Sequence, residues 1–312
     1  MLGVSGGPDS MCMAHLFLHF CREYKLDLTI AHFNHALRKE SDGEEKFVQE
    51  YARQNGIRCV SQKKEIAEAD IDSLEQTARL YRFHFFCEKA RVLKIRKLAL
   101  AHNQDDLAET VLMRLLRGSG LLGLSGFGAV SKYKRLTVVR PLIELPKSEI
   151  IAFLAKERIA YCTDSSNFQT HFLRNKLRLQ LVPLLEKEYN PSIKSVLATV
   201  AKTVAADYDY LVAQAREEYS RLRTKEAHQA VSFDIPAFKR LHVSMQYMVL
   251  RLGLEEVRGD LRRIEYKHLE DTLLLIDDLA PLGALDLPSV VVEKYKGIIR
   301  IKGSVRTSPS FS

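Results

Sequence analysis

Cysteine is scarce and scattered in this sequence of 312 residues. The five cysteines are odd in number and no two form a CxxC pair, so neither a disulfide framework nor a cysteine-built zinc or iron–sulfur site is expected. They are Cys12, Cys21, Cys59, Cys87 and Cys162. This usage is typical of the reducing cytoplasm, which is the location we expect.

Long apolar runs are also missing. No stretch approaches the ~20 residues that a helix needs to cross a bilayer. The first residues lead directly into glycine, proline and aspartate, without the apolar segment of a signal peptide. We therefore expect no membrane partner. The sequence contains no internal repeat.

The overall composition is that of an ordinary globular protein, with 46% hydrophobic and 28% charged residues. At about 150 residues per domain, the length favours two domains. The 47 Lys and Arg against 39 Asp and Glu give a formal net charge of +8. Such an excess allows a polyanionic partner without requiring one.

Short β-type runs alternate with helical patterns in the first half of the chain. This alternation predicts an α/β fold, with a parallel sheet and helices on both faces. Ligands bind such sheets at the carboxyl ends of the strands, where the chemically rich segments of this sequence fall. The expected strands are 26–33, 58–60 and 97–102, and the expected helices are 43–54, 74–90 and 105–117.

The pattern becomes mainly helical from Pro146 onward. A basic helix is expected over 172–181, ended by Pro183, and a domain boundary near Asn190-Pro191. An apolar stripe beginning at Ile193 then predicts a helix of about 30 residues. The rest of the second domain, to residue 303, is expected to contain helices at 236–252 and 261–277 and a small β-pair at 290–293 and 298–301. The tail from Ser304 is expected to be disordered.

The strongest local motif is Ser5-Gly6-Gly7-Pro8-Asp9-Ser10, which follows a short strand. Its glycines let the backbone approach a ligand closely, and Pro8 suits the first turn of a helix whose N–H groups can hold phosphate. The two serines can add hydroxyl donors, and Asp9 is placed to hold Mg²⁺ on phosphate oxygens. The motif is not a Walker loop, which needs a lysine after its second glycine.

This loop resembles that of the N-type ATP pyrophosphatase (PP-loop) superfamily. The resemblance implies that Ser5, Gly6, Gly7, Pro8, Asp9 and Ser10 hold the pyrophosphate part of ATP while the α-phosphate is attacked. It also implies ATP as a co-substrate with Mg²⁺, for which Asp9 is the candidate ligand in this loop.

A second motif, His102-Asn103-Gln104-Asp105-Asp106-Leu107-Ala108-Glu109-Thr110, leaves a strand and opens a helix. Asp106 and Glu109 share one helix face at i and i+3. They can bind Mg²⁺, hold a cationic amine or accept its proton. We expect Asp105 to cap the helix, and the other two carboxylates to face the site.

Four further segments appear in a fixed order. Taken singly they have ordinary explanations: His32 and His35 as satisfied strand-end histidines, Arg79 and Arg82 as a solvated helix face, Arg174 and Arg178 as a basic surface stripe. The segments are His32 to Arg38, Glu75 to Phe83, Arg140-Pro141-Leu142, and Asp164 to Asn167 with Arg174 to Arg178.

Taken together over residues 4–186, the six motifs resemble the tRNA(Ile)-lysidine synthetase family. Asn103 stands where that family often has a second histidine, and Phe83 where a tyrosine usually follows Arg82. The first strand is reduced to Leu2-Gly3-Val4, so this central strand is expected to be short of residues. The second C-terminal domain of longer members is not expected.

The resemblance implies that residues 1–190 form the ATP-binding catalytic domain and residues 191–303 a tRNA-binding domain. The implied reaction ligates free L-lysine to C2 of the wobble cytidine of tRNA(Ile) with a CAU anticodon, through an adenylated base. His32 and His102 would contribute to the nucleotide site. Asp106 or Glu109 would orient the lysine amine. Arg79, Arg82 and Arg174 would contact phosphate, the lysine carboxylate or the tRNA backbone.

Two other hypotheses about the function remain. A tRNA sulfurtransferase on the same scaffold would be expected to need catalytic or cluster-binding cysteines, which the lack of a CxxC pair argues against. A tRNA-binding module without catalysis is the third reading. A homodimer is compatible with all of them.

Overall fold

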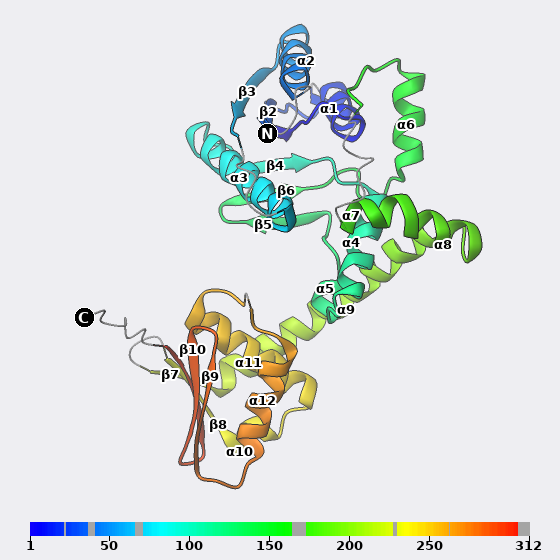
Figure 1. Cartoon of the computed structure of the whole chain (residues 1–312). Helices are drawn as coiled ribbons and strands as arrows, with labels where there is room; N and C mark the ends of the chain where they lie inside the picture. Colours follow the sequence, from blue (N-terminus) through cyan, green and yellow to red (C-terminus); the bar gives the residue numbers. More distant parts are fainter. Residues whose placement is uncertain are drawn as a thin grey trace. The chain divides into compact units, whose positions relative to one another are not determined.

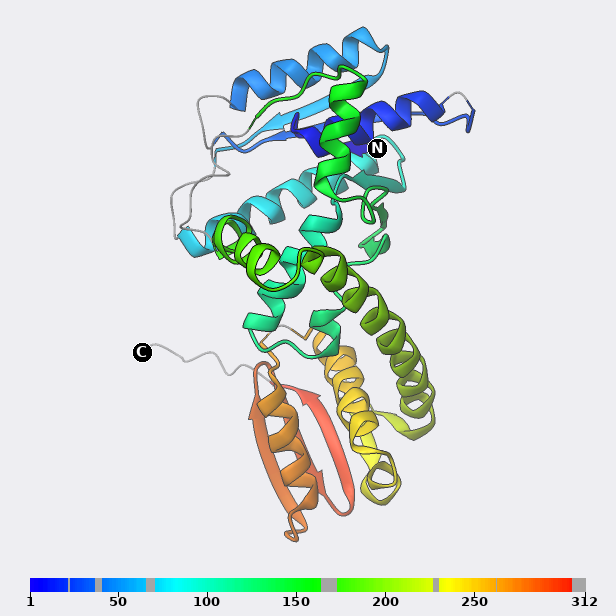
Figure 2. The same ribbon diagram turned by 90° about the vertical axis from the view of Figure 1, so that its right-hand side faces the viewer.

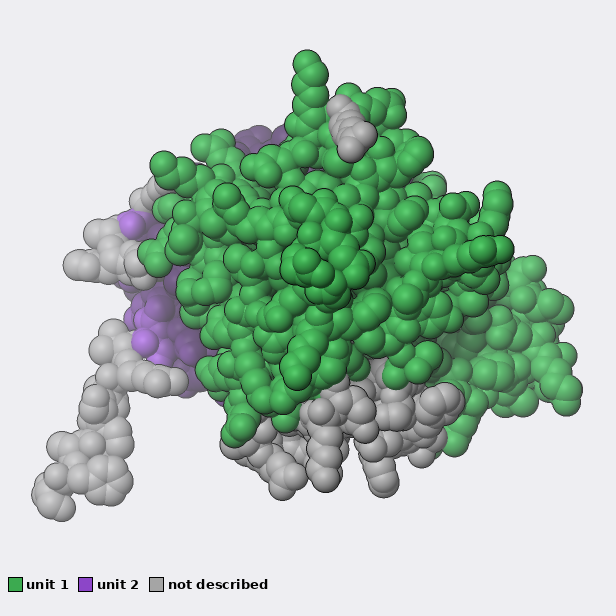
Figure 3. Space-filling view, turned by 90° about the horizontal axis from the view of Figure 1, so that it is seen from above, with its two compact units in different colours: residues 1–205 green, residues 206–312 purple. Residues whose placement is uncertain are grey.

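The computed structural model describes residues 1–21, 23–36, 41–65, 71–163, 173–226, 230–261 and 263–304, without the side chains of residues 71–76 and 225. The chain divides into two compact units, residues 1–205 and 206–312 (Figure 3). The division falls within helix α9 (Ile193–Leu222), which begins directly after the boundary expected near Asn190-Pro191. The first turns of α9 belong to unit 1 because Leu197 and Ala201 pack against Leu107 and Val111.

Unit 1 is built on a six-stranded sheet in the order β3-β2-β1-β4-β6-β5 (Figure 1). The central strand β1 pairs in parallel with both of its neighbours, and only β5 runs antiparallel. The mainly parallel sheet predicted from the alternating pattern is therefore confirmed. The strands are β1 (Leu2–Gly3), β2 (Thr29–Asn34), β3 (Arg58–Lys63), β4 (Lys97–Leu100), β5 (Val130–Tyr133) and β6 (Leu136–Val139).

The β5–β6 hairpin was not predicted. Its turn places Lys134 at a φ of 52°. Two-residue hairpin turns usually contain glycine or asparagine. This turn, Lys134-Arg135, contains neither. The sequence therefore carried no local signal for this pair of strands.

Helices cover both faces of the sheet, as predicted. On one face, α1 (Pro8–Cys21), α2 (Ser41–Gln54) and α6 (Lys147–Lys156) enclose a core that includes Leu2, Ile30 and Ala99. On the other, α3 (Ile71–Val92) packs its phenylalanines against Ala31 and Leu98. Successive strand residues alternate between the two cores, which is the period of an extended chain buried on both sides.

The strand order reverses between β1 and β4. The chain builds outward from β1 to β3 and then returns through α3 to place β4 on the other side of β1. At such a reversal the two following loops diverge and leave room for a ligand. The carboxyl ends of β1 and β4 meet there, and they carry the loop Ser5–Ser10 and the segment beginning at His102.

The remaining helices of unit 1 lie beyond this edge. They are α4 (Gln104–Leu116), α5 (Leu121–Leu124), α7 (Leu173–Lys176), a π-helical turn (Leu177–Leu181) and α8 (Val182–Glu188). The prediction that Pro183 ends the basic helix is wrong. Pro183 lies in the first turn of α8, where proline is tolerated. The π-helical turn before it shifts the register of the backbone hydrogen bonds, so the chain stays helical through this position.

Several predicted features lie outside the described residues. They are Leu37 and Arg38, the segment Asp164 to Asn167, the start of the predicted basic helix at Phe172, and the tail from residue 305.

Unit 2 contains an antiparallel five-stranded sheet in the order β7-β8-β11-β10-β9. Helices α11 and α12 cover one face of it (Figure 2) and bury Phe233, Leu250 and Ile301. The elements are β7 (Arg223–Glu226), β8 (Ala230–Asp234), α10 (Ile235–Lys239), α11 (Val243–Arg258), α12 (Tyr266–Asp277), β9 (Leu282–Leu287), β10 (Val290–Tyr295) and β11 (Ile298–Gly303). The predicted β-pair is confirmed as β10 and β11.

Three strands of unit 2, β7, β8 and β9, were missed. β7 is a short polar segment and β9 contains a glycine, so neither has the β-branched alternation that marks a strand in sequence. The helix predicted at 236–252 is interrupted between α10 and α11, where His242 begins α11 as its N-cap. Within the described part of the chain, no helix has the length and apolar character that a bilayer crossing requires.

Candidate functional site

The loop from Ser5 to Ser10 curls around the hydroxyl of Ser10. Ser10 Oγ accepts hydrogen bonds from the N–H groups of Ser5 (3.1 Å) and Gly6 (3.2 Å), and it donates to Gly7 O at 2.9 Å. Ser10 is buried, whereas Ser5 is exposed. Pro8 begins α1, so the positive end of that helix faces the loop. Loop N–H groups and a helix N-terminus together form an arrangement that suits phosphate.

Gly6 supplies the turn of the loop. Its φ is +93°, in the region that favours glycine, and its carbonyl accepts a hydrogen bond from Cys162 N–H at 2.9 Å. The loop is thus fixed at one end by the hydroxyl of Ser10 and in the middle by the backbone of a distant segment.

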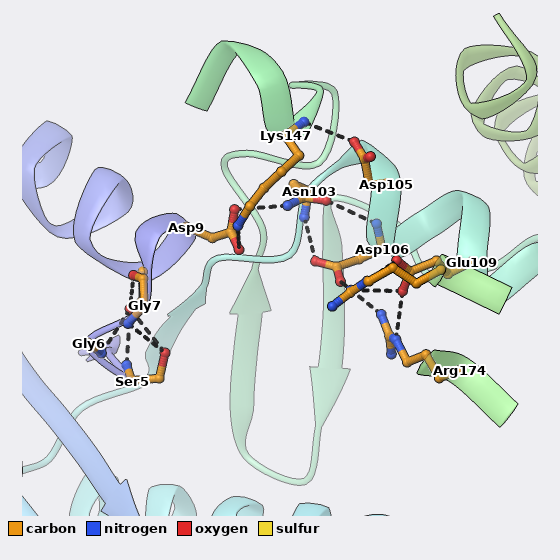
Figure 4. A network of polar contacts seen from close by, with 12 residues as sticks. Ser5, Gly6, Gly7, Asp9, Asn103, Asp105, Asp106, Glu109, Lys147 and Arg174 are labelled. Carbon is orange, nitrogen blue, oxygen red and sulfur yellow. Dashed lines mark hydrogen bonds and ion pairs between the residues drawn. The ribbon is translucent and has the colours of Figure 1, made fainter. Parts of the chain in front are cut away.

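Asp9 links this loop to two other helices. Its Oδ1 accepts a hydrogen bond from Asn103 Nδ2 at 3.0 Å, and its Oδ2 lies 2.5 Å from Lys147 Nζ (Figure 4). Lys147 is the first residue of α6, and its N–H donates to Asp105 Oδ1 at 2.9 Å. The N-terminal turns of α1, α4 and α6 therefore converge on one polar cluster.

Asn103 caps α4, and the expectation that Asp105 would do so is wrong. Asn103 Oδ1 accepts from Asp106 N–H (3.0 Å), and Asp106 Oδ2 accepts from Asn103 N–H (3.1 Å). The helix begins at Gln104, so Asn103 occupies the N-cap and Asp106 the third helical position of a capping box. Asp105 instead pairs with Lys194 at 2.8 Å and accepts from the Lys147 backbone.

Asp106 and Glu109 lie on one face of α4, as their spacing predicts, and two arginines bind both. Arg174 donates from Nε to Glu109 Oε2 and from Nη2 to Asp106 Oδ1, both at 2.8 Å (Figure 4). Arg178 donates from Nε to Glu109 Oε1 at 2.6 Å and from Nη2 to Glu109 Oε2 at 2.9 Å. The Glu109 side chain is 5% exposed and the Asp106 side chain 17%. Two carboxylates and two guanidiniums thus form a balanced, largely buried network.

His102 stands at the end of β4 beside this network. Its ring lies 5.1 Å from that of Phe127, and Nδ1 has no hydrogen-bond partner among the described residues. Burial lowers its pKa to about 3; the charges of Arg140, Arg82 and Arg174 act in the same direction, while Asp106 opposes them. The imidazole is therefore neutral at physiological pH.

His32 occupies a different environment. It is 2% exposed on β2, and its Nδ1 lies 2.9 Å from Val4 O, the residue that precedes the loop. Burial lowers its pKa as well, so the ring is neutral. Its contact with the backbone of Val4 steadies the entry to the loop.

Several arginine side chains lie close enough to His102 or to one another to interact electrostatically. Burial, and then the charge of Arg79, lowers the pKa values of Arg114 and Arg140. Arg79 is exposed, with its guanidinium 5.6 Å from the centre of the Phe83 ring, whereas Arg82 is half-buried. Like charges brought together in this way favour an anionic ligand.

The donor set of Asp9 and Asp106 suits Mg²⁺, which prefers hard oxygen ligands. The two carboxylates are joined through Asn103, which contacts one oxygen of each. Within the described ranges, no three His, Cys, Asp or Glu side chains form a metal-binding group. That is compatible with Mg²⁺, which is usually held by one or two carboxylates together with substrate phosphates.

The structure brings together most of the residues singled out from the sequence and adds three. Asn103 and Lys147 were not expected at the site, and Arg178 was noted only as the second arginine of a motif. The departure of Asn103 from the family pattern was a signal for its capping role. No sequence signal pointed to Lys147, because 138 positions of chain separate it from Asp9.

Comparisons with known proteins identify the family and the fold. The profile of the PP-loop domain family matches residues 1–185. The chain belongs to the PP-loop family. A solved structure, the U34-tRNA thiolase NcsA from Methanococcus maripaludis with its [4Fe-4S] cluster, shares the fold with a TM-score of 0.54 and 18% identity, over 66% of this chain and 71% of that one.

Two relatives carry a more specific name. This PP-loop chain is 32% identical over 279 residues to the tRNA(Ile)-lysidine synthase of Clostridium tetani, covering 88% of this chain and 59% of the relative. It is 37% identical over 302 residues to that of Geobacter sulfurreducens, covering 94% and 62%. The chain thus spans about three fifths of the length of these relatives.

Proposed function

We propose that this chain uses ATP to ligate L-lysine to C2 of the wobble cytidine of a tRNA(Ile) with the anticodon CAU. The observation that carries the proposal is the bridge from Asp9 through Asn103 to Asp106. It brings the Ser5–Ser10 loop close to the carboxylates of α4, which supports a nucleotide site next to an amine site. The names of the relatives in Clostridium tetani and Geobacter sulfurreducens support the same reaction.

In the first step, the C2 oxygen of the cytidine attacks the α-phosphorus of ATP and pyrophosphate leaves. Phosphoryl transfer of this kind depends mainly on positioning and on neutralising charge. The N-terminal N–H groups of α1 and the exposed hydroxyl of Ser5 would hold the pyrophosphate, while Ser10 Oγ, which accepts from Ser5 and Gly6, keeps the loop in shape. Mg²⁺, when bound, supplies positive charge at the phosphate oxygens, and Asp9 and Asp106 are the residues that would hold it.

In the second step, the ε-amine of lysine attacks C2, and AMP leaves with the original C2 oxygen. An ammonium has no lone pair, so the amine must first lose a proton. Asp106 is the better placed of the two carboxylates to meet the amine, because 17% of its side chain is exposed against 5% for Glu109. Glu109, which receives three arginine N–H groups, would hold Arg174 and Arg178 in position.

The tRNA must present an unstacked base to this edge of the sheet. The exposed Arg79 and the half-buried Arg82 are suited to phosphate or to the lysine carboxylate, and His102 would contribute to the nucleotide site as a neutral ring. His32 would act on the nucleotide site through Val4. The chain beyond residue 190 would bind the tRNA body through phosphate contacts, which position without reading sequence.

The direct test is transfer of labelled lysine to CAU-anticodon tRNA(Ile) in the presence of ATP, with methionine tRNA as the negative control. The full chain should incorporate lysine into the first tRNA only. Asp106→Asn should reduce incorporation by at least ~100-fold, since it removes the proton acceptor, while tRNA affinity stays nearly unchanged. Glu50→Gln is the matched control: its side chain pairs with Arg53 on the exposed surface of α2, so most activity should remain.

Three results would contradict the proposal. Full activity of Asp106→Asn would remove Asp106 from the reaction. Sulfide-dependent thiolation of the tRNA without lysine incorporation would favour sulfur transfer instead. Tight tRNA binding with no pyrophosphate release from ATP would indicate a module without catalysis.

A further inference from the structure

Lys147 is the residue of the polar cluster to which neither the motifs nor the family resemblance assigns a role. It lies on α6, outside the six motifs, yet its Nζ is 2.5 Å from Asp9 Oδ2. It therefore brings a full positive charge to the loop that would hold the polyphosphate of ATP. Figure 4 shows its side chain extending from α6 across the cluster toward Asp9.

The backbone of Lys147 is fixed independently of its side chain. Its N–H donates to Asp105 Oδ1 at 2.9 Å, and the neighbouring Gln104 N–H donates to Leu145 O at 3.0 Å. These bonds anchor the start of α6 to the start of α4 whatever side chain stands at position 147. The ammonium itself sits at the end of four flexible methylenes, so it can change partner without moving the helix.

The ion pair with Asp9 is poorly suited to a purely structural role. The side chain of Lys147 is 35% exposed and that of Asp9 is 26% exposed. Water screens partly exposed pairs, and such pairs contribute little to folding stability. Asp9 also keeps a second partner in Asn103 Nδ2, so its position does not depend on the lysine.

The charges around the loop indicate what the lysine could bind instead. The loop N–H groups and the α1 terminus supply only partial positive charges. Arg174 and Arg178 are already engaged by Asp106 and Glu109. A polyphosphate entering the loop brings several negative charges, and a cation that binds Asp9 would compete with the ammonium for the same oxygen.

We propose that Lys147 is a further nucleotide-binding residue, whose ammonium exchanges Asp9 for the polyphosphate of ATP when the nucleotide enters the loop. The inference rests on the ATP-dependent function proposed above. It adds a direct phosphate contact from α6 to the contacts of the loop. It also makes Asp9 available to a divalent cation at the moment when the nucleotide binds.

The test compares Lys147→Met, Lys147→Arg and Lys202→Met in the full chain. Lys202 is the matched control, because it forms an exposed ion pair with Glu144 at 2.9 Å, away from the loop. Calorimetry gives the affinities for Mg·ATP and for inorganic pyrophosphate, and electron paramagnetic resonance gives Mn²⁺ binding without nucleotide. None of these measurements needs tRNA or lysine, so their outcome is separate from that of the lysine-transfer test.

We expect Lys147→Met to weaken ATP and pyrophosphate binding by about tenfold or more, the usual effect of removing a charged phosphate contact. Lys147→Arg should retain most of the affinity, and Lys202→Met all of it. Mn²⁺ should bind Lys147→Met as well as wild type or better, because Asp9 has lost a competing cation. A merely structural lysine would lower Mn²⁺ and ATP affinity together.

Two results would overturn the inference. One is unchanged affinity of Lys147→Met for both ATP and pyrophosphate. The other is a parallel loss of Mn²⁺ and ATP binding, which would show that Lys147 only holds Asp9 in place. Normal ATP binding by wild type without lysine transfer would instead count against the proposed reaction and leave the role of Lys147 to be decided by these measurements.

Discussion

Replacing Arg178 with methionine would test whether the carboxylate–arginine network is built around Glu109. Methionine keeps most of the aliphatic length of arginine and removes the guanidinium. Glu109 would lose the donors at 2.6 and 2.9 Å and keep only Arg174 Nε at 2.8 Å. A carboxylate that is 5% exposed would then retain one charged partner.

The size of the effect follows from these contacts. Hydrogen bonds to charged groups contribute about 1.5–3 kcal/mol each, so two of them set an upper range of about 3–6 kcal/mol. The Arg178 side chain is 37% exposed, and water can replace part of what is lost. We therefore expect unit 1 to lose about 2 kcal/mol of unfolding free energy. For a unit of this size, that corresponds to a fall in Tm of about 4–8 °C.

The assay is thermal unfolding followed by circular dichroism. The two units need not unfold together, so the transition of unit 1 is identified as the one that Mg·ATP shifts upward. Arg53→Met is the matched control, since Arg53 pairs with Glu50 on the surface of α2 and 75% of its side chain is exposed. Its Tm should change by less than about 1 °C.

A double-mutant cycle decides whether the loss comes from the contact with Glu109. Glu109→Gln removes the same ion pair from the other side, so the double variant should be less destabilised than the sum of the two single variants, by about 1–2 kcal/mol. Additivity within ~0.3 kcal/mol would refute the reasoning, as would an Arg178→Met variant as stable as wild type.

Three further outcomes are expected. Gly6→Ala should weaken ATP binding measured by calorimetry about tenfold, because alanine at a φ of +93° costs roughly 1–2 kcal/mol and distorts the loop; equal affinity would show that the turn is not required. Since the pKa of His102 is lowered to about 3 against ~6.5 unfolded, its neutral form contributes stability above pH 6.5 that is lost as the pH falls toward 3. Denaturant unfolding of His102→Gln should therefore show about 2 kcal/mol less acid destabilisation between pH 6.5 and pH 5, and an unchanged slope would contradict the assignment. Gly253→Ala should destabilise unit 2 by about 1–3 kcal/mol in thermal unfolding, because the new methyl group would lie 2.9 Å from Ile301 Cδ1 and 3.2 Å from the Phe233 ring; wild-type stability would mean that α11 can move away from the sheet.

Features encoded by neighbouring residues were predicted best. The loop Ser5–Ser10 needs two glycines, a proline and a helix in a fixed local order, and the structure contains that arrangement. The i and i+3 spacing of Asp106 and Glu109 places both on one face of α4 wherever that helix lies. The β10–β11 pair was found because both strands are rich in valine or isoleucine, which favour extended chain.

Features with no clear signal in their own residues were missed or misassigned. β7 and β9 are strands because β8 and β10 offer them hydrogen-bonding edges, not because their own residues favour extension. Aspartate is a residue type that often caps helices, so Asp105 was expected to do so. Because α4 begins at Gln104, the N-cap is Asn103 instead. Pro183 looks like a helix end until the π-helical turn before it is known.

The sequence by itself determined the alternating architecture, the nucleotide loop and the residue types of the carboxylate pair, because each is a short-range pattern of side chains and backbone freedom. Only the tertiary structure decided which charges meet. The pairing of β1 with β4 brings Asp9 to Asn103, and the start of α6 brings Lys147 to Asp9 across 138 positions of chain. A contact between residues so far apart in the sequence depends on how whole helices and strands pack, and no short-range sequence pattern predicts it.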